Sequence, residues 1–263
     1  MTDSPAPAPD RHRDTAPGSA DHSPDHRTAT RDSYDAIAEE YTAWIANELA
    51  AKPYDRAVLG AFSELVLATG SAETLELGCG PGRITAFLAA LGLEASGLDL
   101  SPAMIAQAKQ HHPGIDFTVG TMTCLPRDSD SLAGVVAWYS IIHVPDEDLD
   151  AVFAEVARVL RPGGHFQLAF QLPSEPTHPA EPTDPTEADG LAAGHQVEHF
   201  TELAGIDVDL SFHRRTLGSV ASRLRAHGFA PVARVEREPD QHGQYPESTP
   251  QGYLLMRRLL APK

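Results

Sequence analysis

The pattern of apolar positions becomes regular at about residue 31. From Tyr34 to Leu49, apolar residues recur at three- and four-residue steps, which predicts one face of a helix. Pro53 begins a second predicted helix, which ends near Gly70. We expect residues 31–70 to form a helical cap, part of a single domain over residues 31–263.

Beyond residue 70 the pattern changes to short apolar runs that alternate with helical stretches. Strands are predicted at residues 74–77, 95–98, 115–119, 132–138, 165–170, 230–237 and 252–258. Helices are predicted at residues 83–91, 104–111, 146–160 and 216–227. Repeated strand-helix-strand units with nearly continuous apolar strands indicate a doubly wound α/β fold. We therefore predict a mostly parallel sheet of seven strands with an antiparallel last strand and helices on both faces.

Two segments lack this periodicity. Residues 1–30 combine Pro, Asp, Ser and His with almost no large apolar side chain. They cannot bury enough surface to offset the entropy of ordering, so we expect a disordered tail. Residues 173–197 begin with a run of prolines and acids, which predicts a flexible insertion. This insertion follows the fifth strand, so we expect it near the carboxyl ends of the strands, where ligands bind in such sheets.

Composition narrows the choice of partners. The formal charge of −17, from 37 acidic and 20 basic residues, disfavours nucleic acid and anionic membranes as partners. Cys79 and Cys124 belong to no paired motif, so we expect neither a disulfide framework nor a zinc site. No run approaches the roughly 20 apolar residues of a membrane helix. We expect a cytoplasmic monomer or homodimer that binds a small molecule.

The strongest chemical signal is the turn after the first strand. It reads Glu76-Leu77-Gly78-Cys79-Gly80-Pro81-Gly82-Arg83, with three glycines in five residues. Glycine has no Cβ and accepts positive φ, so a nucleoside or an amino-acid group can lie directly against the main chain. The dinucleotide fingerprint GxGxxG would require Gly or Ala where Arg83 stands, so the spacing here differs from it.

A carboxylate, Asp99, closes the second strand. It lies seventeen residues after Gly82 and precedes Ser101-Pro102, which predicts an N-cap and the first position of a helix. A carboxylate there can accept hydrogen bonds from both hydroxyls of a ribose, each contributing about 1.5–3 kcal/mol. The alternative is a favourable charge at a helix N-terminus. The glycine turn before it favours the ribose.

These motifs resemble those of the class I, seven-stranded S-adenosylmethionine-dependent methyltransferases. ELGCGPGR and GLDLSPAMIAQAK are similar to the first two motifs of that family, and YDAIAEEY, SLAGVVAWYSIIHVP and EVARVLRPGGHFQLAF resemble later segments. The resemblance covers nearly all of residues 31–260. It implies S-adenosyl-L-methionine as cofactor. The implied contacts are Glu76, Gly78, Cys79, Gly80, Gly82 and Arg83 at the methionine part, Asp99 at the ribose, and Leu100 or Met104 at the adenine.

The resemblance also implies contacts outside these two motifs. Many members of the family place an acid after the third strand, but Thr121 and Met122 follow Gly120 here. We therefore expect these two residues to contact the adenine, although Met122 could serve packing alone. Tyr34 and Tyr41 lie on one helical face, which by itself is more typical of docking. The resemblance implies an N-terminal helical lid over the sulfonium, with Tyr34 the better candidate for a cofactor contact.

The fourth strand ends in Trp138-Tyr139-Ser140, where the resemblance places the methyl group and its acceptor. An aromatic ring beside a sulfonium contributes about 0.5–2 kcal/mol. Tyr139 is therefore a candidate for the catalytic pocket, and Trp138 is either a cofactor contact or a core residue. A base is needed only for an acceptor that is protonated at neutral pH, and His143 is the first candidate. Other histidines that could line the pocket, without metal-binding spacing, are His195, His199 and His213.

We predict an enzyme that transfers a methyl group to a small molecule, with a specialised metabolite as one candidate acceptor. The acceptor atom, O, N or C, stays open. Alignment of the acceptor with the methyl carbon can supply about 7–11 kcal/mol of the barrier. One alternative is a protein that binds S-adenosylmethionine without transferring its methyl group. A second is a nicotinamide-dependent reductase with a Rossmann fold.

Overall fold

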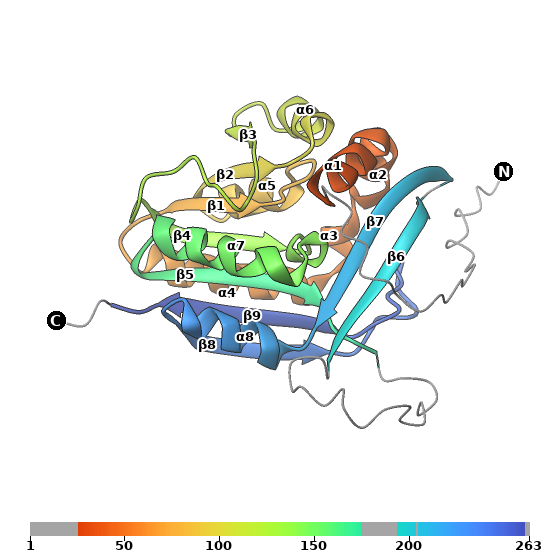
Figure 1. The fold of residues 1–263 in the computed structure, drawn as a ribbon. Helices are drawn as coiled ribbons and strands as arrows, with labels where there is room; N and C mark the ends of the chain where they lie inside the picture. The colour runs from red at the N-terminus through yellow and green to blue at the C-terminus, as the bar shows by residue number, and fades with distance from the viewer. Residues whose placement is uncertain (1–25, 175–193, 204, 261–263) are drawn as a thin grey trace, which may run out of the picture.

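The computed structural model describes residues 26–174, 194–203 and 205–260. Its centre is a seven-stranded sheet in the order β3-β2-β1-β4-β5-β9-β8 (Figure 1). The strands are β1 Glu73–Leu77, β2 Glu94–Asp99, β3 Phe117–Val119, β4 Leu132–Trp138, β5 Leu160–Gln171, β8 Phe229–Arg237 and β9 Gln251–Arg258. The neighbouring pairs β3–β2, β2–β1, β1–β4 and β4–β5 are parallel. Strand β9 pairs antiparallel with both β5 and β8. The predicted sheet, including its antiparallel last strand, is confirmed.

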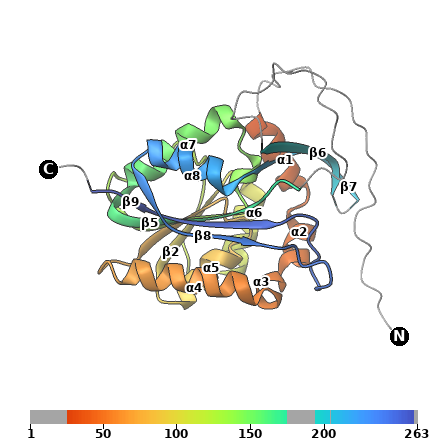
Figure 2. The ribbon, with the colours of Figure 1, turned by 90° about the horizontal axis from the view of Figure 1, so that it is seen from below.

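Helices cover both faces of this sheet, as expected. α4 (Pro53–Leu67) and α5 (Arg83–Ala90) lie on one face, and α7 (Asp146–Val159) and α8 (Leu217–Ala226) lie on the other (Figure 2). Every residue of β4 is buried between the two layers. A strand buried on both faces can be apolar at every position, so its run was easy to detect in the sequence.

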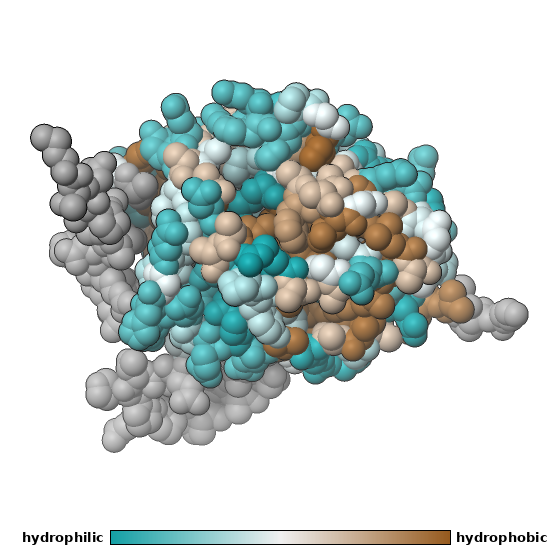
Figure 3. Space-filling view, turned by 180° about the vertical axis from the view of Figure 1, so that it is seen from behind, coloured by the Kyte–Doolittle hydropathy of each residue, from teal (hydrophilic) through white to brown (hydrophobic). Residues whose placement is uncertain are grey.

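The face that carries α4 and α5 shows apolar surface next to polar surface (Figure 3). In α4, Tyr54 and Leu67 remain 40% and 42% exposed. Neither of them lines the pocket described below. None of the helices in the described ranges has the length and hydropathy of a membrane span.

The N-terminal region differs from the sequence prediction. α1 spans His26–Ala36 and is followed by α2 (Ala38–Ile45) and α3 (Glu48–Ala51). Residues 1–25 of the predicted tail lie outside the described residues, but the prediction is wrong for residues 26–30, which are helical. These residues are polar, so hydrophobic periodicity could not detect them. Contacts such as the Arg27–Asp148 ion pair at 2.7 Å join them to the domain.

The predicted insertion also differs. Residues 175–193 lie outside the described residues, but residues 195–197 belong to β6 (His195–Leu203), which pairs antiparallel with β7 (Ile206–Arg215). This hairpin forms a second, two-stranded sheet that stands beside α1 (Figure 1). Ile37 packs against Val208 and Leu210 of β7, all buried. The alternation of Ile206, Val208, Leu210 and Phe212 was the signal that could have predicted β7.

Candidate functional site

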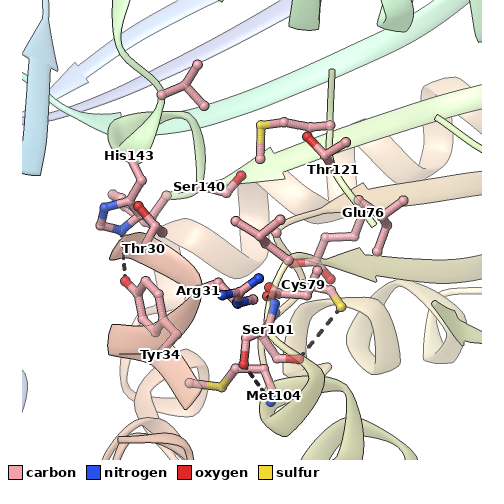
Figure 4. Close-up of a pocket in the computed structure, with 18 of the residues that line it drawn as sticks. Thr30, Arg31, Tyr34, Glu76, Cys79, Ser101, Met104, Thr121, Ser140 and His143 are labelled. Atoms are coloured by element: carbon pink, nitrogen blue, oxygen red, sulfur yellow. Dashed lines mark hydrogen bonds between the residues drawn. The ribbon is translucent and has the colours of Figure 1, made fainter. Parts of the chain in front are cut away.

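The predicted site residues converge on one pocket at the carboxyl ends of β1, β2 and β4 (Figure 4). The pocket has about 1050 Å³ of empty space, a volume that includes solvent at its open mouth. Its walls also include α1, α2 and the short 3-10 helix η1 (Ile141–His143). Every predicted cofactor-binding or catalytic residue lines the pocket except Gly82.

The glycine turn presents bare main chain to this pocket. Gly78 and Gly80 have φ values of 66° and 52°, in the left-handed region that favours glycine. A Cβ on Gly78 would lie 2.4 Å from the Cβ of Ser140, whereas one on Gly80 would meet no atom within 4 Å. Gly82 has a packing role instead, because a Cβ there would lie 2.6 Å from the ring of Phe117. The turn is therefore shaped by both packing and access.

Asp99 lies directly beside the glycine turn. Its Oδ2 accepts a hydrogen bond from the main-chain N–H of Gly80 at 2.7 Å, and its Oδ1 accepts one from Ser101 at 2.9 Å. Burial raises the pKa of Asp99, and these N–H groups act in the opposite direction. Each carboxylate oxygen has two lone pairs, so each can accept one further hydrogen bond. This geometry fits the predicted contact with two ribose hydroxyls.

Glu76 and Arg83 flank the same turn. The Glu76 side chain is buried, and its Oε2 accepts a hydrogen bond from the hydroxyl of Thr85. Burial raises the pKa of Glu76 to about 8, so the carboxyl group is mostly neutral at pH 7. Arg83 pairs with Glu48 of α3 at 2.6 Å. The charges at this end of the pocket are therefore compensated within the protein.

The N-terminal helix α1 is joined to the end of the pocket where adenine is expected. Asp35 accepts hydrogen bonds from the hydroxyl of Ser101 and from the main-chain N–H of Ala103. Ser101 in turn caps α6 (Pro102–His111) by accepting from the N–H of Met104 at 3.0 Å, which confirms the predicted N-cap. Four pocket residues on this side come from β2, α6 and the turn after β3: Leu100, Met104, Thr121 and Met122.

The side chains of Tyr34 and His143, which both line the pocket, contact each other (Figure 4). The Tyr34 hydroxyl lies 2.8 Å from Nε2 of His143, and Nδ1 of His143 lies 3.2 Å from the carbonyl oxygen of Ser211 in β7. A carbonyl oxygen only accepts, so Nδ1 carries the proton and Tyr34 donates to Nε2. Burial lowers the pKa of His143 to about 4. His143 is therefore neutral at pH 7, and its one lone pair is engaged.

Tyr139 has an unusual backbone at the end of β4. Its φ of 52° lies in the left-handed region, which costs a non-glycine residue about 1–2 kcal/mol. The Tyr139 hydroxyl lies 3.5 Å from that of Tyr253, which donates to Asp55 at 2.7 Å. The neighbouring Trp138 is buried, and its Nε1 has no hydrogen-bond partner.

The first two turns of α1 also belong to the site, although no pattern used above predicted them. His26, Arg27, Thr30 and Arg31 line the pocket, as does Asp148 of α7. Together with Tyr34, the four α1 residues recur at steps of three, four and five residues, which is helical spacing. Because the repeated side chains are polar, a search for apolar periodicity passed over them.

Other candidate residues lie outside the pocket. His195, His199 and His213 do not line it, and His195 instead lies 3.1 Å from His213, with the two rings stacked. Arg214 pairs with Glu198 and Arg215 with Asp146. Within the described ranges, no group of three or more His, Cys, Asp or Glu side chains is arranged to hold a metal ion.

Comparison with known families gives a match over the first four strands of the sheet. Residues 74–164 match the model of a family described as "Methyltransferase domain". A malonyl-[acyl-carrier protein] O-methyltransferase of Salmonella typhimurium is 33% identical over 102 residues, and a trans-aconitate 2-methyltransferase of Methylobacterium nodulans is 36% identical over 116. These alignments cover 38% and 41% of this chain and 40% and 42% of the relatives. The chain thus spans about two fifths of the length of these curated relatives.

Solved structures extend the similarity in fold over most of the chain. A magnesium protoporphyrin IX methyltransferase from Synechocystis with bound S-adenosylmethionine has a TM-score of 0.59 at 14% identity, covering 91% of this chain and all of that one. A 1,6-didemethyltoxoflavin-N1-methyltransferase from Burkholderia thailandensis has a TM-score of 0.54 at 17% identity, covering 85% and 91%. At these identities the similarity concerns the fold alone.

Proposed function

We propose that this chain is a class I S-adenosylmethionine-dependent methyltransferase, which transfers the methyl group of S-adenosyl-L-methionine to a small-molecule acceptor; the matched methyltransferase domain and the similar fold support this. The observation that carries this proposal is the 2.7 Å contact between Asp99 and the main chain of Gly80. It brings a carboxylate and an open stretch of main chain together at the carboxyl edge of the sheet. A nucleoside that carries an amino acid needs both features in one place.

The residues present fit this cofactor. Asp99 would accept from the ribose hydroxyls, and Gly78 and Gly80 would lie along the methionine part. Leu100, Met104, Thr121 and Met122 would surround the adenine. Trp138 lines the pocket next to Tyr139, and its Nε1 is buried in the core. The cofactor supplies an activated methyl group with a neutral leaving group, so the protein has mainly to align the acceptor and exclude water.

Tyr139 and His143 are the proposed residues on the acceptor side. Tyr139 is held in a strained backbone conformation on the pocket wall, which fits a positioning role. His143 can act as a base only after Tyr34 releases its Nε2, because that lone pair accepts the Tyr34 hydroxyl. We therefore propose that His143 first orients Tyr34 over the pocket. Its role as a base stays a prediction.

The relatives support a small acceptor without naming it. Their printed names include trans-aconitate, 1,6-didemethyltoxoflavin and a malonyl group on a carrier protein. Those acceptors differ, although the matched methyltransferase domain is shared. In this chain α1 and the β6–β7 hairpin lie outside residues 74–164. The part of the pocket that we propose receives the acceptor therefore has to be interpreted from this chain alone.

Two experiments test the proposal. Calorimetric titration with S-adenosylhomocysteine should show binding, and stabilisation by NAD or NADP without stabilisation by S-adenosylhomocysteine would favour the reductase. Incubation with methyl-labelled cofactor and a broad panel of acceptors should then give a labelled product. Tight binding with no turnover on any acceptor would favour a protein that only binds the cofactor.

A further inference from the structure

The pocket-facing side of α1 is basic in a strongly acidic protein. His26, Arg27 and Arg31 line the pocket, whereas Asp32 and Asp35 of the same helix do not. Asp35 instead contacts the start of α6. With a formal charge of −17 over the chain, random placement would favour acids on any surface. The basic side chains of α1 therefore lie on the side of the helix that faces the pocket, and its aspartates do not.

The two arginines are paired differently. Arg27 forms an ion pair with Asp148 at 2.7 Å, and Asp148 itself lines the pocket and is 25% exposed. Arg31 pairs with its neighbour Asp32 at 2.8 Å, but the Asp32 side chain is 61% exposed and outside the pocket. An ion pair this exposed contributes little to stability. Figure 4 shows Arg31 extending from α1 toward the turn that carries Cys79.

Among the described residues that line the pocket, the candidate bases are protonated or already engaged: Glu76 is mostly neutral at pH 7 and accepts from Thr85, and His26 lies 3.5 Å from Asp148. Burial raises the pKa values of Tyr34, Tyr41 and Tyr139, so their hydroxyl groups stay protonated. His143 has both ring nitrogens in hydrogen bonds. The carboxylates Asp99 and Asp148 are engaged with main-chain N–H groups and with Arg27. A nucleophile that is already unprotonated at neutral pH suits this pocket best.

We propose that the acceptor is a small carboxylic acid, bound through its carboxylate by Arg31 and methylated on a carboxylate oxygen. This inference rests on the proposed methyltransferase function. A planar guanidinium matches a carboxylate and can hold one oxygen while a lone pair of the other faces the methyl carbon. That lone pair forms the O–C bond as the C–S bond breaks, and the C–S electron pair goes to sulfur. No proton is released. An anion and a sulfonium cation give two neutral products, so their attraction in a pocket of low dielectric favours the approach.

The test uses the full chain and S-adenosylmethionine labelled on the methyl group. The acceptors are matched sets of one skeleton with a carboxylate, a primary amide or an alcohol, for mono- and dicarboxylic acids. We expect label only on the acids, and mild alkali should release it as methanol because the product is an ester. Label that resists alkali, or that appears on alcohols or amides in preference to acids, would overturn the inference.

Substitution of Arg31 separates the acceptor from the cofactor. With the best acid, Arg31→Gln should raise KM at least tenfold and leave the Kd of S-adenosylhomocysteine within twofold, and Arg31→Lys should recover part of the loss. Arg161→Gln is the matched control, because Arg161 pairs with Glu73 outside the pocket and should show no change.

Three results of the S-adenosylhomocysteine titration and the labelling assay would contradict the inference, and each would have a different meaning. If Arg31→Gln weakens S-adenosylhomocysteine tenfold, the arginine holds the cofactor and the inference is wrong. If no acid is labelled although S-adenosylhomocysteine binds, the inference fails but the cofactor assignment stands. If S-adenosylhomocysteine does not bind to the unmodified chain, the proposed function itself fails.

Discussion

The floor and the wall of the pocket are built in different ways. The floor consists of the glycine turn and the end of β2, where Gly80 and Asp99 are 19 residues apart in sequence. The wall consists of α1 and η1, where Tyr34 and His143 are 109 residues apart, and the β6–β7 hairpin supports it from outside the pocket, for example through Ser33 and Asp209, which are 176 apart. The floor lies within the matched residues 74–164, whereas the wall joins η1, which lies inside that range, to α1 and its supporting hairpin, which lie outside it. This difference suggests that the floor fixes the cofactor and the wall decides the acceptor.

The largest expected effect tests the floor. Asp99→Ala should weaken S-adenosylhomocysteine by at least tenfold and by up to about a hundredfold, since hydrogen bonds to a charged group contribute about 1.5–3 kcal/mol each. Calorimetry measures the change. Asp99→Asn keeps the volume and part of the hydrogen bonding, so it should lose less. Equal affinity in all three proteins would remove Asp99 from the ribose role.

The next effect tests the wall. His143→Ala should lower turnover about tenfold and change Kd for S-adenosylhomocysteine less than Asp99→Ala does, because the variant releases Tyr34 but leaves the floor intact. Since burial lowers the pKa of His143 to about 4, turnover of the unmodified protein should show no inflection near pH 6.5 from this residue. A loss of a hundredfold or more, with such an inflection, would instead support a base.

A smaller effect concerns the stability of the floor against pH. The folded-state pKa of Glu76, about 8, is above its ordinary value of 4.5, so its stabilising effect is complete at low pH and is lost as pH rises toward 8. His143 and His213, both near 4, add stability as pH rises to about 6.5 and are neutral above that. Between pH 6.5 and 8, the melting temperature should therefore fall by a few degrees.

Glu76→Gln isolates this contribution. Glutamine resembles the neutral carboxyl group that accepts from Thr85, so the variant should fold and its melting temperature should be flat over the same window. Parallel curves for the two proteins between pH 6.5 and 8 would show that Glu76 is not the titrating group.

The smallest effect tests where the wall begins. Removal of residues 1–30 should lower the melting temperature by a few degrees more than removal of residues 1–25, because only the longer deletion removes the first turn of α1 and the Arg27–Asp148 pair. The same difference should appear in KM for the acceptor, since Arg27 and Thr30 line the pocket. Identical behaviour of the two truncated proteins would place the start of the functional wall after residue 30.

Prediction from the sequence succeeded where local rules apply. The apolar run at 132–138 is β4 residue for residue, and Ser101 caps α6 as its position before Pro102 predicted. Gly82 shows the limit of such rules, because spacing alone could not distinguish a glycine that faces a ligand from one that packs against Phe117. The same holds for His143, whose tautomer depends on Ser211 in a strand that the sequence did not predict, and whose low pKa results from its burial in the folded protein.

The sequence by itself determined the sheet and the cofactor floor, because buried parallel strands, glycine turns and helix caps are specified by residues close together in the chain. Only the tertiary structure decided the wall. Its contacts join residues more than a hundred positions apart, and its pocket-facing side chains are polar, so no short-range pattern records them. In our proposal the acceptor is selected by that wall, and its chemistry depends on Arg31.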